Sequence, residues 1–140
     1  MPIKLESANR IIAAAFDKGR TLKLKPLSVV VLDPGGHVIA FQRQDLASNL
    51  RFEIARGKAA GALALGVSSR KIAVMAAERP SFVASLSGLA SLVPAAGGVI
   101  AVDGDGEILG AVGVTGDSSD NDEICALAGI AAAGLKAQQG

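Results

Sequence analysis

Residues 29–41 of the chain read VVVLDPGGHVIAF, two apolar runs separated by a turn. The runs Val29–Leu32 and Val38–Phe41 contain the β-branched and aromatic residues that favour strands. Between them, Asp33-Pro34-Gly35-Gly36 supplies residues that start turns or tolerate positive φ. The stretch therefore predicts a β-hairpin.

A second hairpin is predicted where Asp103-Gly104-Asp105-Gly106 separates the apolar runs Val99–Val102 and Ile108–Val114. Apolar periodicity and cap residues also predict five helices. These span Ser7–Lys18, Ser48–Leu65, Ser69–Glu78, Ser81–Leu89 and Asn121–Lys136. Hairpins alternating with helices favour an α+β fold, in which a central antiparallel sheet built from hairpins carries helices on its faces.

Helix ends and glycines give further local expectations. Ser7 and Ser48 are predicted to be N-caps, and Gly19 is predicted to end the first helix. Three glycines of the second helix would each weaken an isolated helix by roughly 1 kcal/mol relative to alanine, so we expect another backbone to approach closely there. They are Gly57, Gly61 and Gly66.

The composition indicates a single domain over residues 1–140 that associates with itself. Half of the residues are hydrophobic, 19% are charged and only 3% are aromatic. A chain of this size is not expected to hide so much aliphatic surface within one protomer, so we predict a homo-oligomer, from a dimer to an octamer. The net charge of +1, without a basic patch or many aromatic residues, argues against nucleic acid as a partner.

The N-terminus lacks the apolar core of a signal peptide, and no apolar run is long and glycine-free enough to span a bilayer. A cytoplasmic protein without a membrane partner is therefore expected. One histidine and one cysteine exclude a zinc site of nitrogen and sulfur ligands within one chain, so no metal site is predicted. Cys125 is expected to be a packed small residue, because nearby carboxylates oppose thiolate formation at its helix start.

Three cations are the first candidates for a binding site. Arg43 follows the first hairpin, and Arg51 and Lys58 lie on the next helix. Together they could hold a carboxylate or another anion, the arginines by a planar fork and the lysine as a point charge. The alternative is that they are solvated charges or salt bridges between subunits.

His37 is the only histidine and directly follows the glycines of the first turn. It could transfer a proton, ligate a metal or serve as an axial ligand of haem. At the tip of an isolated hairpin it would instead be exposed and play no role. The acids at the start of the last helix, Glu123 among them, complement the helix dipole, and one of them could act as a general base.

Several segments together resemble the GlcG/HbpS-like family, which also supplies the C-terminal domain of PduO-type corrinoid adenosyltransferases. The segments occur in the family's order and cover nearly the whole chain. They are Val30–Arg43, Ala55–Ala60, Gly97–Val99, Ile108–Gly116 and Asp120–Glu123. The resemblance implies a profilin-like fold, assembly into dimers and octamers, and, in some members, haem binding or haem degradation.

Two functions follow as hypotheses. The first is an oligomeric protein that binds a small ligand, haem or another tetrapyrrole, through His37, with the ligand's anionic groups near Arg43, Arg51 or Lys58. The alternative is a cofactor-independent isomerase or tautomerase acting on a small organic acid or an intermediate of aromatic catabolism. In that enzyme Arg43 and Arg51 would hold the carboxylate, Lys58 would steady the enolate, and Asp33, His37 or Glu123 would move the proton. A purely structural or accessory oligomer also stays open.

Overall fold

The computed structural model describes residues 1–139 as an α+β fold around one antiparallel sheet. The helices are α1 (Leu5–Thr21), α2 (Arg51–Leu65), α3 (Ser69–Glu78), α4 (Pro80–Leu86) and α5 (Ser119–Ala132). The strands are β1 (Ser28–Leu32), β2 (Val38–Arg43), β3 (Gly98–Val102), β4 (Ile108–Thr115) and β5 (Lys136–Ala137). Their order across the sheet is β2-β1-β4-β3-β5, and every neighbouring pair is antiparallel.

Both predicted hairpins are confirmed, and strand register puts their turns at the same end of the sheet. Leu32, which precedes the first turn, pairs with Ala111, near the start of β4. Ser28, at the start of β1, pairs with Thr115, the last residue of β4. We call the end that carries residues 33–37 and 103–107 the turn end, and the other the opposite end.

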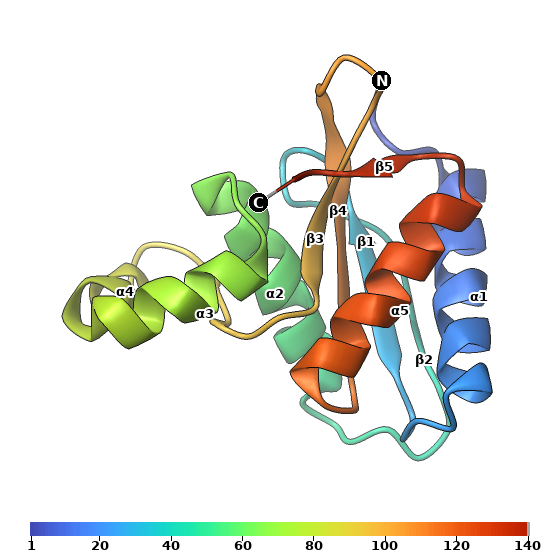
Figure 1. The fold of residues 1–140 in the computed structure, drawn as a ribbon, viewed down its shortest axis with the longest axis horizontal. Helices are drawn as coiled ribbons and strands as arrows, with labels where there is room; N and C mark the ends of the chain where they lie inside the picture. The colour runs from blue at the N-terminus through green and yellow to red at the C-terminus, as the bar shows by residue number, and fades with distance from the viewer. Residues whose placement is uncertain (140) are drawn as a thin grey trace.

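Helices cover both faces of the sheet, as Figure 1 shows. α1 and α5 lie side by side on one face, over large aliphatic side chains such as Val29, Val31 and Val114. α2 covers the other face with small residues, Ala55, Ala59 and Ala62. α3 and α4 project to the side of the sheet. All five residues of β1 are buried, as expected for a strand covered on both faces.

The small residues on α2 allow its backbone to lie close to its neighbours. A Cβ on Gly57 would lie 2.6 Å from Val93 Cγ2, and one on Gly61 would lie 2.6 Å from Leu92 Cβ. The expected close approach is therefore confirmed at these two positions. At Gly66 it is wrong, because a Cβ there would meet nothing within 4 Å. Gly66 instead ends α2 with the positive φ of 73° that glycine adopts readily.

Helix ends differ from the predictions where packing outweighs local signals. α1 begins after Lys4 rather than Ser7, and it continues through Gly19 to Thr21. Gly19 is buried within the helix, where a Cβ would lie only 2.7 Å from Leu27 Cδ1. α2 begins at Arg51, and Ser48 instead accepts a hydrogen bond from the Arg51 side chain.

The predicted end of the last helix is also wrong. α5 stops at Ala132, and Lys136 belongs to the short edge strand β5, which pairs with β3. Across residues 1–139, no single helix has the length and hydropathy to cross a membrane. Only α2 and α3 taken together, with an 80° bend between them, meet those two criteria.

Candidate functional site

The turn between β1 and β2 is organised by one carboxylate. Asp33 Oδ1 accepts the backbone N–H groups of Gly35 and His37, each at 2.9 Å. Gly36 completes the turn at φ 85°, a conformation that side chains disfavour. The pKa of Asp33 lies below its ordinary value, chiefly because the carboxylate accepts the backbone N–H of His37. Asp33 is therefore a charged acceptor beside the only histidine.

The His37 ring is exposed but held in place. Its side chain is 82% exposed, and Nδ1 lies 3.3 Å from Asp33 Oδ1. Because a carboxylate only accepts, this contact places the ring hydrogen on Nδ1. In the neutral ring this leaves the lone pair on Nε2, which has no hydrogen-bond partner within residues 1–139. A carboxylate behind the imidazole is the arrangement that orients metal-ligating histidines.

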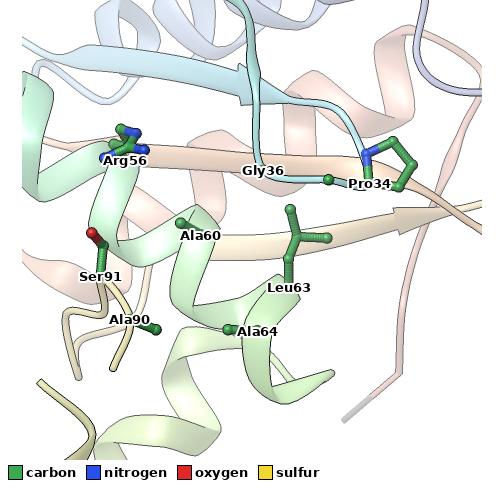
Figure 2. Close-up of a pocket in the computed structure, with 9 residues that line it drawn as sticks. Pro34, Gly36, Arg56, Ala60, Leu63, Ala64, Ala90 and Ser91 are labelled. Atoms are coloured by element: carbon green, nitrogen blue, oxygen red, sulfur yellow. The ribbon is translucent and has the colours of Figure 1, made fainter. Parts of the chain in front are cut away.

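A cavity of about 260 Å³ lies between this turn and the C-terminal half of α2 (Figure 2). Pro34, Ala60 and Leu63 form the apolar part of its lining, and Arg56 is its one charged residue; polar and apolar groups share the lining about equally. His37 does not line the cavity. Its ring stands beside Gly35, which does: a Cβ on Gly35 would lie 3.0 Å from His37 Nδ1. The cavity and the exposed imidazole thus share one loop.

Arg43 lies far from His37, because His37 precedes β2 and Arg43 is its last residue. The two residues are six positions apart along the strand, about 20 Å of extended chain. Arg43 is exposed and borders a separate hollow of about 550 Å³, whose apolar part is formed by Phe16, Leu24 and Pro26. The geometry does not bring His37 and Arg43 to one ligand within a protomer.

Lys58 is buried and paired instead of facing a cavity. Its Nζ lies 3.1 Å from Asp122 Oδ2 and donates to the carbonyl oxygen of Val114 at 3.0 Å. The two side chains are 3% and 1% exposed. Burial lowers the pKa of Lys58 and raises that of Asp122, and the attraction between the two opposes both shifts. The pair joins α2, β4 and the start of α5.

Arg51 and Glu123 have partners of different kinds. Arg51 donates to Thr115 Oγ1 at 2.7 Å and to Ser48 Oγ at 3.1 Å. Glu123 accepts from Arg70, which also pairs with Asp120 at the surface. Of the six predicted site residues, Asp33 and His37 therefore meet at the turn end. Arg43, Arg51, Lys58 and Glu123 all belong to elements that meet at the opposite end.

Two further expectations concern sulfur and metals. Cys125 is fully buried, and burial, with the nearby Asp122 charge, raises the pKa of its thiol to about 11. It packs as a small residue, as the sequence predicts. Among the described residues, no group of three or more histidine, cysteine or acidic side chains is arranged to hold a metal ion.

Two residues of the cavity and of the buried ion pair, Arg56 and Asp122, are not among the site residues predicted from the sequence. Arg56 lies on α2 one turn before Ala60 and two before Ala64, so its i, i+4, i+8 spacing puts it on the cavity-lining stripe. In the sequence, Asp122 is only one of several acids at a helix start. The signal that could have paired it with Lys58 is the lysine on an apolar stripe, which requires a buried counter-charge.

Comparison with known proteins gives the chain a family and a fold. Residues 3–131 match the family described as haem degrading protein HbpS-like. The structure of a PduOC:heme complex is 23% identical, with a TM-score of 0.88 over 99% of this chain and 100% of that one. HbpS is 29% identical, with a TM-score of 0.81 over 94% and 89%.

Klebsiella pneumoniae ORFY, a DUF336 protein, is 24% identical, with a TM-score of 0.84 over 94% of this chain and 90% of that one. No curated protein matches the chain. The family match covers nearly all of the described sequence and agrees with the expected profilin-like fold. The chain belongs to the HbpS-like family.

Proposed function

We propose that this protein binds haem at the turn end, with His37 Nε2 as the ligand to the iron. The observation that carries the proposal is the exposed imidazole, held through Nδ1 by Asp33, on the loop that lines a partly apolar cavity. Family membership and the haem complex of a structural neighbour support the same ligand. When bound, haem would supply a redox-active iron.

The residues present fit the chemistry of haem. Neutral imidazole is a common axial ligand, and the Asp33 carboxylate fixes the tautomer and orientation of the ring that would donate to iron. Pro34, Ala60 and Leu63 would contact the apolar porphyrin, and the Arg56 guanidinium would pair with a propionate. Each of these groups lies on the turn or on the adjoining face of α2.

The size of the cavity indicates that one protomer covers only part of the ligand. About 260 Å³ is below the range of roughly 300–1,000 Å³ typical of sites that enclose a drug-sized molecule. Haem held here would therefore leave a large apolar area exposed. A second copy covering that area would reduce the exposure, so we propose that the binding form is a homo-oligomer.

Hemin titration of the purified protein tests this function. The wild-type protein should shift the Soret band at a fixed stoichiometry, and His37→Ala should lose the shift. Arg56→Gln should keep a His-ligated spectrum with weaker affinity, because only the propionate contact is removed. Arg10→Gln, which removes an exposed cation of α1, is the matched control and should bind as the wild type does. A full shift in His37→Ala would contradict the proposal.

A further inference from the structure

A second polar cluster lies at the opposite end of the sheet, on the face that α2 covers. Ser28 pairs with Arg43 on one side and with Thr115 on the other. These three residues therefore form a row across β2, β1 and β4, with side chains directed to the same face. Val30 and Phe41, two residues along their strands, pack with the α2 face and fix which face this is.

Ser28 has an unmet hydrogen-bonding requirement. The residue is fully buried, and its Oγ is the one buried side-chain oxygen or nitrogen in residues 1–139 without a hydrogen-bond partner. An orphaned buried hydroxyl is costly, and native proteins seldom retain one without a reason. Thr115, directly opposite on β4, is also buried, but its hydroxyl accepts from Arg51.

Arg51 is a half-buried cation without an acidic partner. Its hydrogen bonds go to the hydroxyls of Thr115 and Ser48, and no salt bridge involves it within the described chain. It is the first residue of α2, whose N-terminus has no side-chain cap. The positive end of the helix dipole therefore adds to the guanidinium charge.

The surrounding charges favour an anion. Burial is the main cause that lowers the pKa of Lys58, and the positive charge of Arg51 adds to it; the counter-ion of Lys58, Asp122, is already engaged. The Arg43 side chain makes no hydrogen bond or salt bridge in the described residues. Glu53, the acid in the first turn of α2, is exposed and unpaired there. The cluster thus carries uncompensated positive charge beside an orphaned hydroxyl.

We propose that this cluster, Ser28, Arg51, Thr115 and Arg43, is a binding site for a small carboxylate. The carboxylate would accept from Ser28 Oγ and Arg51 at the N-terminus of α2, with Arg43 as the outer cation. Because Ser28 is buried, a neighbouring side chain must move to admit the ligand, and we propose that it is Arg51, which would leave Thr115. The site lies about one strand length from His37 and is separate from the proposed haem site.

Acetate is the probe for this site. ¹⁵N–¹H NMR would follow wild-type protein titrated with sodium acetate at constant sodium concentration, with chloride as the exchanged anion. Shifts should concentrate at Ser28, Thr115 and the Arg51 Nε–H, with a Kd on the order of 1 mM for so small a ligand. Absence of shifts at these three groups would overturn the proposal.

Two variants separate binding from folding. Ser28→Ala should weaken acetate binding by about tenfold, and Arg51→Gln by at least about tenfold, because each removes a hydrogen bond to a charged group. Ser28→Ala removes an unpaired hydroxyl, so its urea midpoint should be no lower than that of the wild type. Unchanged acetate affinity in folded Ser28→Ala would overturn the site.

Arg43→Gln and Arg10→Gln complete the test. The outer cation is exposed, so Arg43→Gln should weaken binding by only about threefold. Arg10→Gln should bind acetate as the wild type does, and an equal loss in this control would show a general charge effect and overturn the proposal. Arg51→Gln should give the wild-type hemin titration. The two measurements therefore test the carboxylate site and the haem site independently.

Discussion

The two ends of the sheet each hold a carboxylate beside a nitrogen base, but in opposite surroundings. At the turn end, Asp33 holds the exposed ring of His37. At the opposite end, Asp122 holds Lys58 where neither side chain reaches solvent. In the exposed pair one ring nitrogen has no hydrogen-bond partner within residues 1–139, whereas the buried pair directs its hydrogen bonds to the protein.

The difference shows that burial decides what such a pair can do. In a buried ion pair each charge must be balanced by its partner, because removing either partner leaves an unpaired buried charge at a high cost in free energy. Lys58 and Asp122 therefore act as a structural connection among α2, β4 and α5. Asp33 and His37 are free of that constraint, and we propose that they bind the ligand.

Removal of the buried lysine should have the largest effect. Lys58→Met leaves the Asp122 carboxyl buried without its partner, which should lower the free energy of unfolding by about 3–5 kcal/mol. Urea denaturation followed by circular dichroism measures this loss. The double variant Lys58→Met/Asp122→Leu should recover most of it, and a double variant no more stable than the single one would contradict the role of the pair.

The next largest loss of stability is expected from a substitution in the tightly packed surroundings of Lys58. A Cβ on Gly98 would collide with the carbonyl oxygen of Lys58 and lie 2.9 Å from Ser69 Oγ. Gly98→Ala should therefore cost about 1–3 kcal/mol of stability, as overpacking does. Gly104→Ala, in the turn between β3 and β4, is the matched control because its Cβ would meet nothing within 4 Å. Equal thermal midpoints for the two variants would contradict the close packing at the opposite end.

A smaller effect depends on pH. Hydrogen bonds from Asn121 and from the backbone N–H of Lys25 lower the pKa of Asp117 from 3.8 to about 2. A carboxyl whose folded pKa is depressed stabilises the fold above its unfolded pKa, and this contribution disappears as pH falls from about 4 to about 2. Urea midpoints measured over this range should fall more steeply for the wild type than for Asp117→Asn. Urea midpoints that fall equally steeply with pH in the two proteins would contradict this contribution of Asp117.

The smallest expected effect is the reaction of the Cys125 thiol in the native protein. Cys125 is buried, and the pKa of its thiol is raised to about 11, so little thiolate exists near pH 8. A colourimetric thiol reagent should react slowly with the native protein and fully in denaturant. Rapid reaction in native buffer would show that α5 opens readily from the sheet.

Much of the fold was predictable because its signals are local. The turn residues at 33–36 and 103–106 predict both hairpins, and the apolar spacing of α1 predicts its buried face. Helix ends were less predictable, because tertiary packing decided them. Gly19 stays inside α1 through its contact with Leu27, and β5 is defined by pairing with β3 rather than by its own two residues.

The candidate site was only partly predictable, because contact between distant elements cannot be read from spacing. The sequence points to His37 and Asp33, whose pairing is local to one turn. It does not show that Lys58 meets Asp122 across 64 positions, or that Arg51 meets Thr115. It also grouped Arg43 with His37, which the length of β2 keeps apart.

The contrast between the two ends is tested most directly by one hemin titration with two variants. His37→Ala should keep the wild-type urea midpoint, because the ring is exposed and, within residues 1–139, forms a hydrogen bond only with Asp33. It should lose the Soret shift, because the proposal makes His37 the iron ligand. Lys58→Met/Asp122→Leu, studied where it is folded, should keep the full shift with the wild-type midpoint of titration. Loss of the shift in the double variant, together with its retention in His37→Ala, would contradict the account.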